Sequence, residues 1–303
     1  MVSLYEFCSK VKKNKNKDNR EKNKDFKLMT INCKGQLIDL TEPKVMGILN
    51  ITPNSFFDGG KHSDLKAILS QVEKMLSEGA TFIDIGGYSS KPSAEFVSED
   101  EEIERLLPVV QQIVREFPIA ILSIDTFRSK VAQATIENGA AIINDISAGK
   151  LDDTMLETVA QLQVPYIIMH MKGTPQTMQS MAQYGNIVKE MVFYFSERVA
   201  QARSLGINDI IIDPGFGFAK TIQQNFEVLN KLELFQMLEL PLLAGVSRKS
   251  MIYRTLETTP EFALNGTTSL NTIALLKGAK ILRVHDVKEA VECVTLYHQL
   301  NIK

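Results

Sequence analysis

Short apolar runs alternate with longer amphipathic stretches along most of this chain. The first cycle opens with the run at 45–49, passes through a loop rich in proline, glycine and asparagine, and then shows apolar residues at helical spacing from Leu65 to Leu76. Gly79 follows where a helix C-cap would stand. Seven further apolar runs come at 81–85, 119–124, 141–143, 164–169, 210–212, 242–244 and 281–284. The predicted helices after the eight runs cover 65–76, 103–114, 128–138, 152–162, 187–205, 222–232, 264–276 and 287–300.

Strict alternation of strands and helices predicts parallel strands with both faces of the sheet covered. Eight such units between residues 45 and 300 fit a (β/α)8 TIM barrel, an α/β fold. The alternative is a doubly wound open sheet, which usually has fewer units and a Gly-x-Gly-x-x-Gly first turn. The first turn here reads Asn50-Ile51-Thr52-Pro53, so we predict the barrel over residues 29–303, opened by a hairpin around Gly35.

The first 28 residues differ in composition from the rest. They hold nine Lys or Arg residues against four Asp or Glu, and Lys10 to Lys27 is mostly lysine and asparagine. Such a segment has too few apolar residues to fold alone, so we predict a disordered tail over residues 1–28. A basic tail is able to bind acidic partners, but a solvated tail is the favoured interpretation.

The composition of the whole chain narrows its partners and its compartment. The net charge is −2, which gives no overall basic surface for nucleic acid. No apolar run reaches the length of a membrane span. The three cysteines, Cys8, Cys33 and Cys293, are far apart and form no Cys-x-x-Cys, which fits a reducing cytoplasm and argues against a disulfide framework or a zinc site. We therefore expect a cytoplasmic protein with no nucleic-acid or membrane partner.

Nearly every predicted strand ends in side chains that form hydrogen bonds. In a TIM barrel the active site lies at these carboxyl ends. Taken singly, each such residue is more typical of a helix cap or a turn; together they predict a pocket. The residues are Asn50, Ser89, Ser90, Lys91, Asp125, Asn144, Asp145, His170, Asp213, Ser247, Arg248, Lys249, Arg283 and His285.

One part of this set favours a flat heterocycle. Asp125, Asn144, Asp213 and Lys249 bring carboxylate, amide and amine groups from four strands. Buried carboxylates need hydrogen-bond donors or a cation, so they suit the donor-rich edge of a ring such as an amino-pyrimidinone. The alternative is a structural ion-pair network, which also perturbs such groups.

Another part favours an anion. Asn50, Arg283 and His285 come from the first and eighth strands, which are neighbours in a closed barrel. An Arg fork beside a His is typical of an anion site, and the Asn50 oxygen suits a cation such as Mg²⁺. For His285 alone, a buried histidine with satisfied hydrogen bonds is the alternative, but Arg283 two residues earlier places both on one face of the strand.

Nine ordered motifs lie along these strand ends. They are Met46-Gly47-Ile48-Leu49-Asn50-Ile51-Thr52-Pro53; Phe56 with Asp58-Gly59-Gly60; Asp84-Ile85-Gly86-Gly87; Ser123-Ile124-Asp125-Thr126; Ile143-Asn144-Asp145-Ile146-Ser147; Met169-His170-Met171 with Gly173; Asp213-Pro214-Gly215-Phe216-Gly217-Phe218; Ser247-Arg248-Lys249-Ser250; and Arg283-Val284-His285-Asp286-Val287. Together they make the chain resemble the dihydropteroate synthase family of the folate pathway, over essentially all of residues 30–300. Any one motif alone would be weak.

The resemblance implies a transferase reaction. In it, 4-aminobenzoate displaces pyrophosphate from 6-hydroxymethyl-7,8-dihydropterin pyrophosphate and gives 7,8-dihydropteroate. The expected catalytic residues are Asp125, Asp213, Lys249 and Arg283. The resemblance further implies that the pterin is held by Asp125, Asn144, Asp213 and Lys249; pyrophosphate with Mg²⁺ by Asn50, Arg283 and His285; and aminobenzoate by Ser90, Lys91, Pro92, Phe218 and Ser247, while Met169 and Gly217 also contact substrate.

Two loops depart from the family pattern. The chain has Tyr88-Ser89-Ser90-Lys91-Pro92-Ser93 where Glu-Ser-Thr-Arg-Pro-Gly is usual, and Asn54 stands where Asp is usual. The family is a target of sulfonamides, and these departures bear on loop closure and on sulfonamide sensitivity. They do not bear on the pterin site.

Two alternatives to the synthase remain at this point. A pterin-binding methyltransferase domain that uses methyltetrahydrofolate would share the barrel and the pterin site, but it has no use for an anion site. A non-catalytic scaffold would not need polar groups on nearly every strand end. The resemblance also implies a homodimer formed through the late helices.

Overall fold

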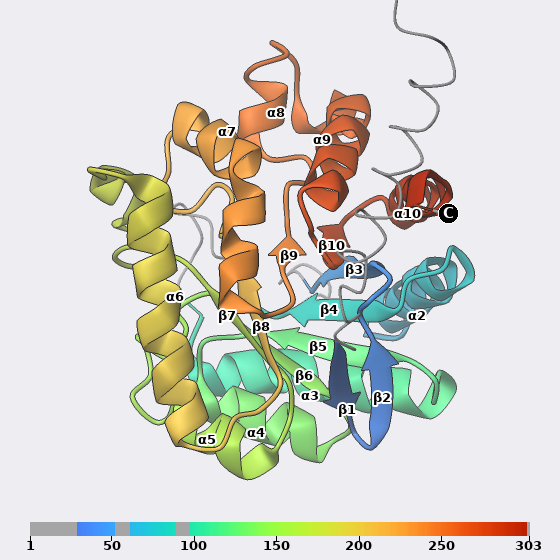
Figure 1. Ribbon diagram of the computed structural model, residues 1–303. Helices are drawn as coiled ribbons and strands as arrows, with labels where there is room; N and C mark the ends of the chain where they lie inside the picture. The colour runs from blue at the N-terminus through green and yellow to red at the C-terminus, as the bar shows by residue number, and fades with distance from the viewer. Residues whose placement is uncertain (1–28, 52–60, 89–96, 302–303) are drawn as a thin grey trace, which may run out of the picture.

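The computed structural model describes residues 29–51, 61–88 and 97–301, and these form a barrel with an antiparallel hairpin at one end (Figure 1). Eight parallel strands follow the order β8-β7-β6-β5-β4-β3-β10-β9. A parallel bridge between Ile212 and Leu242 joins the two outer strands, and the Ile212 amide donates to the Pro241 carbonyl at 3.0 Å. The strands are β3 (Lys44–Asn50), β4 (Phe82–Gly86), β5 (Ile121–Asp125), β6 (Ile142–Asp145), β7 (Tyr166–Met169), β8 (Ile210–Asp213), β9 (Leu243–Ala244) and β10 (Ile281–Val284).

Helices surround this sheet, as the apolar stripes of the sequence predict (Figure 1). The one that follows β9 comes only after an extra short helix and a 3-10 turn that the sequence pattern did not reveal. The helices are α2 (Lys61–Ser77), α3 (Glu99–Glu116), α4 (Ser129–Glu137), α5 (Met155–Leu162), α6 (Ile187–Ser204), α7 (Ile222–Asn230), α8 (Ser250–Tyr253), α9 (Leu264–Leu276) and α10 (Val287–Asn301), with 3-10 helices η2 (Met178–Met181), η3 (Leu232–Leu238) and η4 (Pro260–Phe262).

The apolar stripes of these helices pack on the outer face of the sheet. Val72, Leu106, Val131 and Val159 are among the buried residues of this layer. It is the largest of the three hydrophobic clusters, as expected when the strands are buried on both faces. The predicted (β/α)8 barrel is therefore confirmed.

The predicted hairpin is also confirmed, and it closes the lower end of the barrel. Strands β1 (Thr30–Cys33) and β2 (Gln36–Asp39) pair antiparallel around Lys34 and Gly35, whose φ angles of 55° and 86° are those of a tight hairpin turn. Ile31 and Leu40 pack inside the barrel at that end, against the inward-facing residues at the starts of the strands. Those residues include Met46, Phe82, Ile121, Ile142, Ile167, Ile211, Leu243 and Ile281.

The third strand begins later than the sequence pattern predicts. The apolar run opens at Ile119, but β5 begins at Ile121, because residues 117–120 form a turn in which Ile119 is 83% exposed. No helix within the described ranges is long and apolar enough to cross a membrane. The predicted tail over residues 1–28 lies outside the residues that the structure describes.

Candidate active site

Alternation along the strands places a layer of polar side chains inside the barrel, next to the apolar layer that packs on the hairpin and nearer the carboxyl ends of the strands. Successive side chains of a strand point to opposite faces, so residues two apart share a face. Phe82, Ile142, Ile167, Ile211 and Ile281 face the hairpin inside the barrel. Two positions further towards the carboxyl ends, the same faces carry Asp84, Asn144, Met169, Asp213 and Arg283. The sequence therefore builds the mouth of the barrel directly on its core.

Arg283 organises one side of this layer. Its Nε donates to Asp84 Oδ2 at 2.6 Å and its Nη2 donates to Asp125 Oδ2 at 2.7 Å. Asn144 Nδ2 donates to the same Asp84 oxygen at 3.0 Å. Asp84 is fully buried, and its second oxygen, Oδ1, has no hydrogen-bond partner among the residues described. A buried acceptor of this kind is one that a ligand or a water would satisfy.

Asp213 and Lys249 form the other side. Asp213 Oδ1 accepts a hydrogen bond from the Gly215 amide at 2.7 Å. The Lys249 ammonium donates to the Phe216 carbonyl and lies 4.8 Å from the centroid of the Phe218 ring. Burial lowers the pKa of Lys249 to about 8, although Asp213 acts against this shift. Burial raises the pKa of Asp213, with Lys249 opposing. The two groups therefore support each other's charge inside the barrel.

The charge states of the Arg283 cluster follow from the same balance. Burial works against the charge of Arg283, but Asp84 and Asp125 outweigh it and raise the pKa of Arg283 above its ordinary value. Burial raises the pKa of Asp125 to about 7, and Arg283 limits that rise. Asp125 is therefore a carboxylate of this layer whose pKa lies near neutral pH.

Ser247 and His285 meet beside Arg283. Ser247 Oγ lies 3.0 Å from His285 Nδ1, and the His285 amide donates to Ser247 Oγ at 3.2 Å. Burial and the nearby Arg283 charge lower the pKa of His285 to about 4. At neutral pH the imidazole is uncharged, so His285 offers an anion a hydrogen bond, and Arg283 supplies the positive charge.

Asn50 ends β3, the strand that pairs with β10, as predicted for a closed barrel. Its side chain is exposed, and it lies opposite Gly86 of β4 in the register. Among the described residues, no group of three or more His, Cys, Asp or Glu side chains is arranged to hold a metal ion.

An apolar wall completes the mouth. Met169 packs with Ile146, Met171 and Met178, and Phe218 lies against this cluster. Gly217 is next to Lys249, since an added Cβ would lie 3.3 Å from Lys249 Cδ. The role of Met169, Gly217 and Phe218 in substrate binding stays a prediction. Ser90, Lys91, Pro92 and Asn54 lie outside the residues that the structure describes.

Three of the strand-end residues do not join the mouth. Asp145 faces the outer layer, where its carboxylate accepts hydrogen bonds from Tyr166 Oη at 2.6 Å and Ser147 Oγ at 2.7 Å. Arg248 turns away to a bidentate ion pair with Asp286 at 2.7 and 2.8 Å. His170 is buried below the loop that follows β8. The expectation that all strand-end polar residues share one pocket is wrong for these three, because they fall on the other face of their strands or beyond them.

Asp84 lies in the mouth but is not among the site residues that the sequence predicts. It lies in the middle of a predicted strand and not at its end, so it was not expected among the site residues. The signal was present, because an acid between Ile83 and Ile85, two positions after Phe82, lies on the inward face of the strand.

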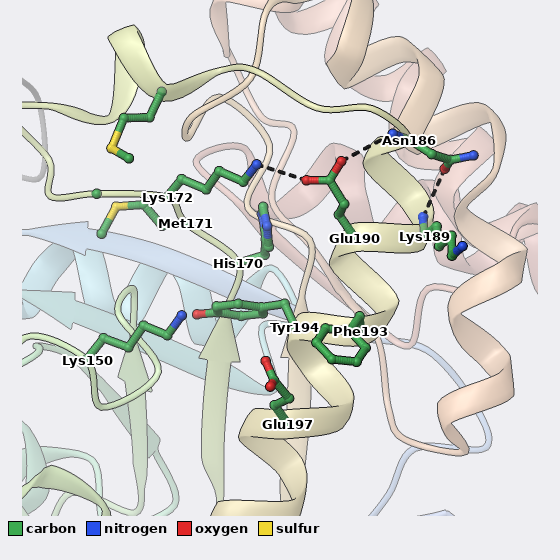
Figure 2. A pocket seen from close by; sticks show the side chains of 12 residues that line it. Lys150, His170, Met171, Lys172, Asn186, Lys189, Glu190, Phe193, Tyr194 and Glu197 are labelled. Atoms are coloured by element: carbon green, nitrogen blue, oxygen red, sulfur yellow. Dashed lines mark hydrogen bonds and ion pairs between the residues drawn. The ribbon is translucent and has the colours of Figure 1, made fainter.

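A separate cavity of about 700 Å³ lies beside α6, away from the polar layer. Figure 2 shows His170 and Tyr194 in its wall, with Lys150 and Lys172 extending into it. Lys172 Nζ pairs with Glu190 at 3.0 Å, and Lys150 Nζ lies 4.3 Å from the centroid of the Tyr194 ring. Among the residues that the structure describes, none of those expected to bind substrate lines this cavity.

Comparisons with known proteins agree with the geometry. A family described as pterin binding enzyme matches residues 46–285. Dihydropteroate synthase of Escherichia coli (strain K12) is 42% identical over 268 residues, which cover 88% of this chain and 94% of that protein. The structure of Yersinia pestis dihydropteroate synthase with a sulfonamide drug is 40% identical, with a TM-score of 0.84 over 90% of this chain and 99% of that one. Dihydropteroate synthase of Xanthomonas albilineans with 4-aminobenzoic acid is 36% identical, with a TM-score of 0.84 over 91% and 99% of the two chains.

The barrel and the family match define the class as a pterin-binding transferase built on a TIM barrel. Within that class, the chain belongs to the dihydropteroate synthase family.

Proposed function

We infer that this chain catalyses the dihydropteroate synthase reaction, in which the amine of 4-aminobenzoate displaces pyrophosphate from 6-hydroxymethyl-7,8-dihydropterin pyrophosphate. A carbon–nitrogen bond forms as the carbon–oxygen bond to pyrophosphate breaks, and the amine gives up a proton. The observation that carries the inference is a polar layer in a chain of this family, in which the buried Asp84, Asn144 and Asp213 lie with the partly buried Asp125 and Arg283.

The roles in pterin binding are proposed from this layer. Asp125, Asn144 and Asp213 present acceptors to the N–H groups of the pterin, and Lys249 contacts a ring oxygen or nitrogen. The burial of Asn144 and Asp213 and the partial burial of Asp125 and Lys249 support the proposal, because a hydrogen bond to an ionised group is stronger where water is excluded. As pyrophosphate leaves, positive charge grows on the pterin methylene, and carboxylates fixed nearby stabilise that charge without reorganising.

The leaving group is assigned to the β3–β10 side of the mouth. Two of the five N–H groups of Arg283 are engaged by Asp84 and Asp125, and the guanidinium retains further donors for an anion. His285 and Ser247 lie beside it. Asn50 suits Mg²⁺, an ion that keeps several waters and commonly uses one or two protein ligands together with substrate phosphates. When bound there, Mg²⁺ would neutralise charge on the departing pyrophosphate.

Aminobenzoate is placed against Ser247 and Phe218, together with Ser90, Lys91 and Pro92 of the second loop. Its aromatic amine is already a nucleophile, so no strong general base is assigned. The proximity of Ser247 to His285 supports this arrangement, since it brings the aminobenzoate and pyrophosphate sites next to each other.

We also propose a homodimer and a cytoplasmic location. An exposed apolar patch joins η3 to the end of α9, where Lys277 pairs with Glu233 at 2.9 Å. We call it the η3–α9 patch, formed by Leu234, Met237, Ile273 and Leu276. Its position on the late part of the chain supports a self-association surface. The free thiols of Cys33 and Cys293 are compatible with a reducing compartment.

The experiment that tests the function compares two donor substrates. The purified chain is incubated with 4-aminobenzoate and pterin pyrophosphate, or with methyltetrahydrofolate and a corrinoid acceptor. We expect 7,8-dihydropteroate in the first mixture and no methyl transfer in the second. Methyl transfer without dihydropteroate would instead support the pterin-binding methyltransferase.

A further inference from the structure

The loop that carries Asp213 has an unusual backbone. Gly215, Gly217 and Ala219 have φ angles of 66°, 85° and 46°, all in the left-handed region. Gly215 packs so closely that an added Cβ would lie 2.4 Å from the His170 carbonyl oxygen. A non-glycine residue such as Ala219 keeps this conformation only where its surroundings enforce it. The loop therefore needs contacts that hold its shape.

Lys220 provides the most extensive of these contacts. Its side chain is buried, and Nζ donates to the carbonyls of Gly215 at 2.9 Å and Phe218 at 3.0 Å. The same nitrogen lies 3.1 Å from His170 Nδ1 and 3.4 Å from the His170 carbonyl. One ammonium thus ties the end of β7 to two points of the loop after β8. A buried ammonium is costly unless its hydrogens are bonded, and here neutral acceptors surround it.

His170 is suited to receive this contact. Burial, together with the nearby lysine charges, lowers the pKa of His170 to about 2, so the imidazole is neutral. Because Nδ1 faces the Lys220 ammonium, Nδ1 carries the lone pair and the ring proton resides on Nε2. The burial of this strand-end histidine is thereby explained, since it serves as an acceptor for Lys220 and not as a ligand of the mouth.

The loop held by Lys220 is the one that shapes the pterin side of the mouth. It carries Asp213, the Phe216 carbonyl that receives Lys249, and the Phe218 ring below the Lys249 ammonium. We propose that Lys220 is a positioning residue, whose ammonium holds this loop so that Asp213 and Lys249 face the pterin. The proposal rests on the proposed function. Burial lowers the pKa of Lys220 to about 7, and the nearby Asp213 carboxylate opposes this shift, so the two groups attract each other.

The test uses Lys220→Met, which keeps the length of the side chain and removes its charge and donors. The control is Lys150→Met, the same change at an exposed lysine whose nitrogen lies over the Tyr194 ring, away from this loop. Binding of 6-hydroxymethyl-7,8-dihydropterin and of pyrophosphate with Mg²⁺ is measured by calorimetry. We expect Lys220→Met to weaken pterin binding by about tenfold or more and pyrophosphate binding by less than about twofold. The control should leave both within about twofold.

Hydrogen exchange gives a readout that does not depend on the substrate. Amides of residues 215–219 should exchange faster in Lys220→Met, while those of β4 and β5 exchange as in the unmodified chain. Unchanged exchange in the loop, or equal losses for pterin and pyrophosphate, would overturn the proposal. If the unmodified chain failed to bind the pterin, the proposed function would be contradicted, and exchange would still decide the role of Lys220.

A second variant at the same position tests the proposal if Lys220→Met does not fold. Lys220→Gln keeps N–H donors on a shorter side chain without the charge, and the same two measurements apply to it. An intermediate pterin affinity, with loop exchange between those of the unmodified chain and Lys220→Met, supports the proposal. Loss of the folded state in both variants would overturn it, because Lys220 would then serve the whole fold and not the loop.

Discussion

The position of a single residue along its strand decides whether it takes part in the site. Asp125, Asn144 and Asp213 could be predicted from the sequence because each follows or ends an apolar run, and Arg283 because it lies two residues before His285 on the last strand. Asp84 was missed because it lies inside such a run, and Asp145 was included although it faces outwards by one position. Strand ends are visible in a sequence, but the face of a short buried strand is harder to assign, since residues on both faces are apolar.

Asp125 should give pterin binding a dependence on pH. Its pKa of about 7 means that it is mostly ionised above that pH and mostly protonated below it. A protonated carboxyl is a poorer acceptor, so pterin affinity should fall by about tenfold between about pH 8 and about pH 6. Calorimetric titration over this range measures it, and Asp125→Asn should remove the dependence.

The stability of the fold should change with pH in the opposite direction to the pterin affinity. The pKa of Asp125 in the fold lies above the ordinary value of 3.8, so its contribution to stability is complete at low pH and is lost as pH rises through about 7. Affinity gained at the expense of stability is expected at a binding site. A flat affinity profile would show that Asp125 does not carry the charge that the pterin needs.

At the scale of elements, the order of strands and helices was predictable, and the small additions were not. Each main helix shows an apolar stripe at a period of 3.6 residues, which any barrel helix needs. The extra helix α8 has only four residues, too few to show a period, and η3 and η4 are also short. The packing of the hairpin inside the barrel could not be predicted either, because it brings together residues of eight strands that are far apart in the sequence.

A substitution in the packing of the hairpin should lower the stability of the fold without changing pterin affinity. Leu40 is fully buried among the inward-facing residues at the lower end of the barrel. Leu40→Ala removes that packing and should lower the free energy of unfolding by about 2–5 kcal/mol. Denaturant unfolding measures the loss, and Leu37→Ala, at a position 69% exposed on β2, is the control. Pterin affinity should not change in either variant, and a change in Leu40→Ala would mean that the hairpin also shapes the mouth.

At the scale of the whole molecule, the η3–α9 patch should govern self-association. Leu276 is 59% exposed within it, and a carboxylate there would have to be desolvated in an interface. Leu276→Asp should convert the dimer to a monomer in sedimentation experiments. The control is Ile119→Asp, at an exposed position in the turn before β5 and outside the patch, and it should leave the dimer intact. A chain that sediments as a monomer without any substitution would contradict the proposed dimer.

The central claim is that the mouth of this barrel joins 4-aminobenzoate to the pterin with loss of pyrophosphate. The most direct measurement follows pyrophosphate release from the pterin pyrophosphate, with and without 4-aminobenzoate. The account predicts release that depends on 4-aminobenzoate, equals the 7,8-dihydropteroate formed, and is abolished in Asp213→Asn, where an amide donor replaces the buried acceptor. Release at the same rate without 4-aminobenzoate, or full activity in Asp213→Asn, would contradict it.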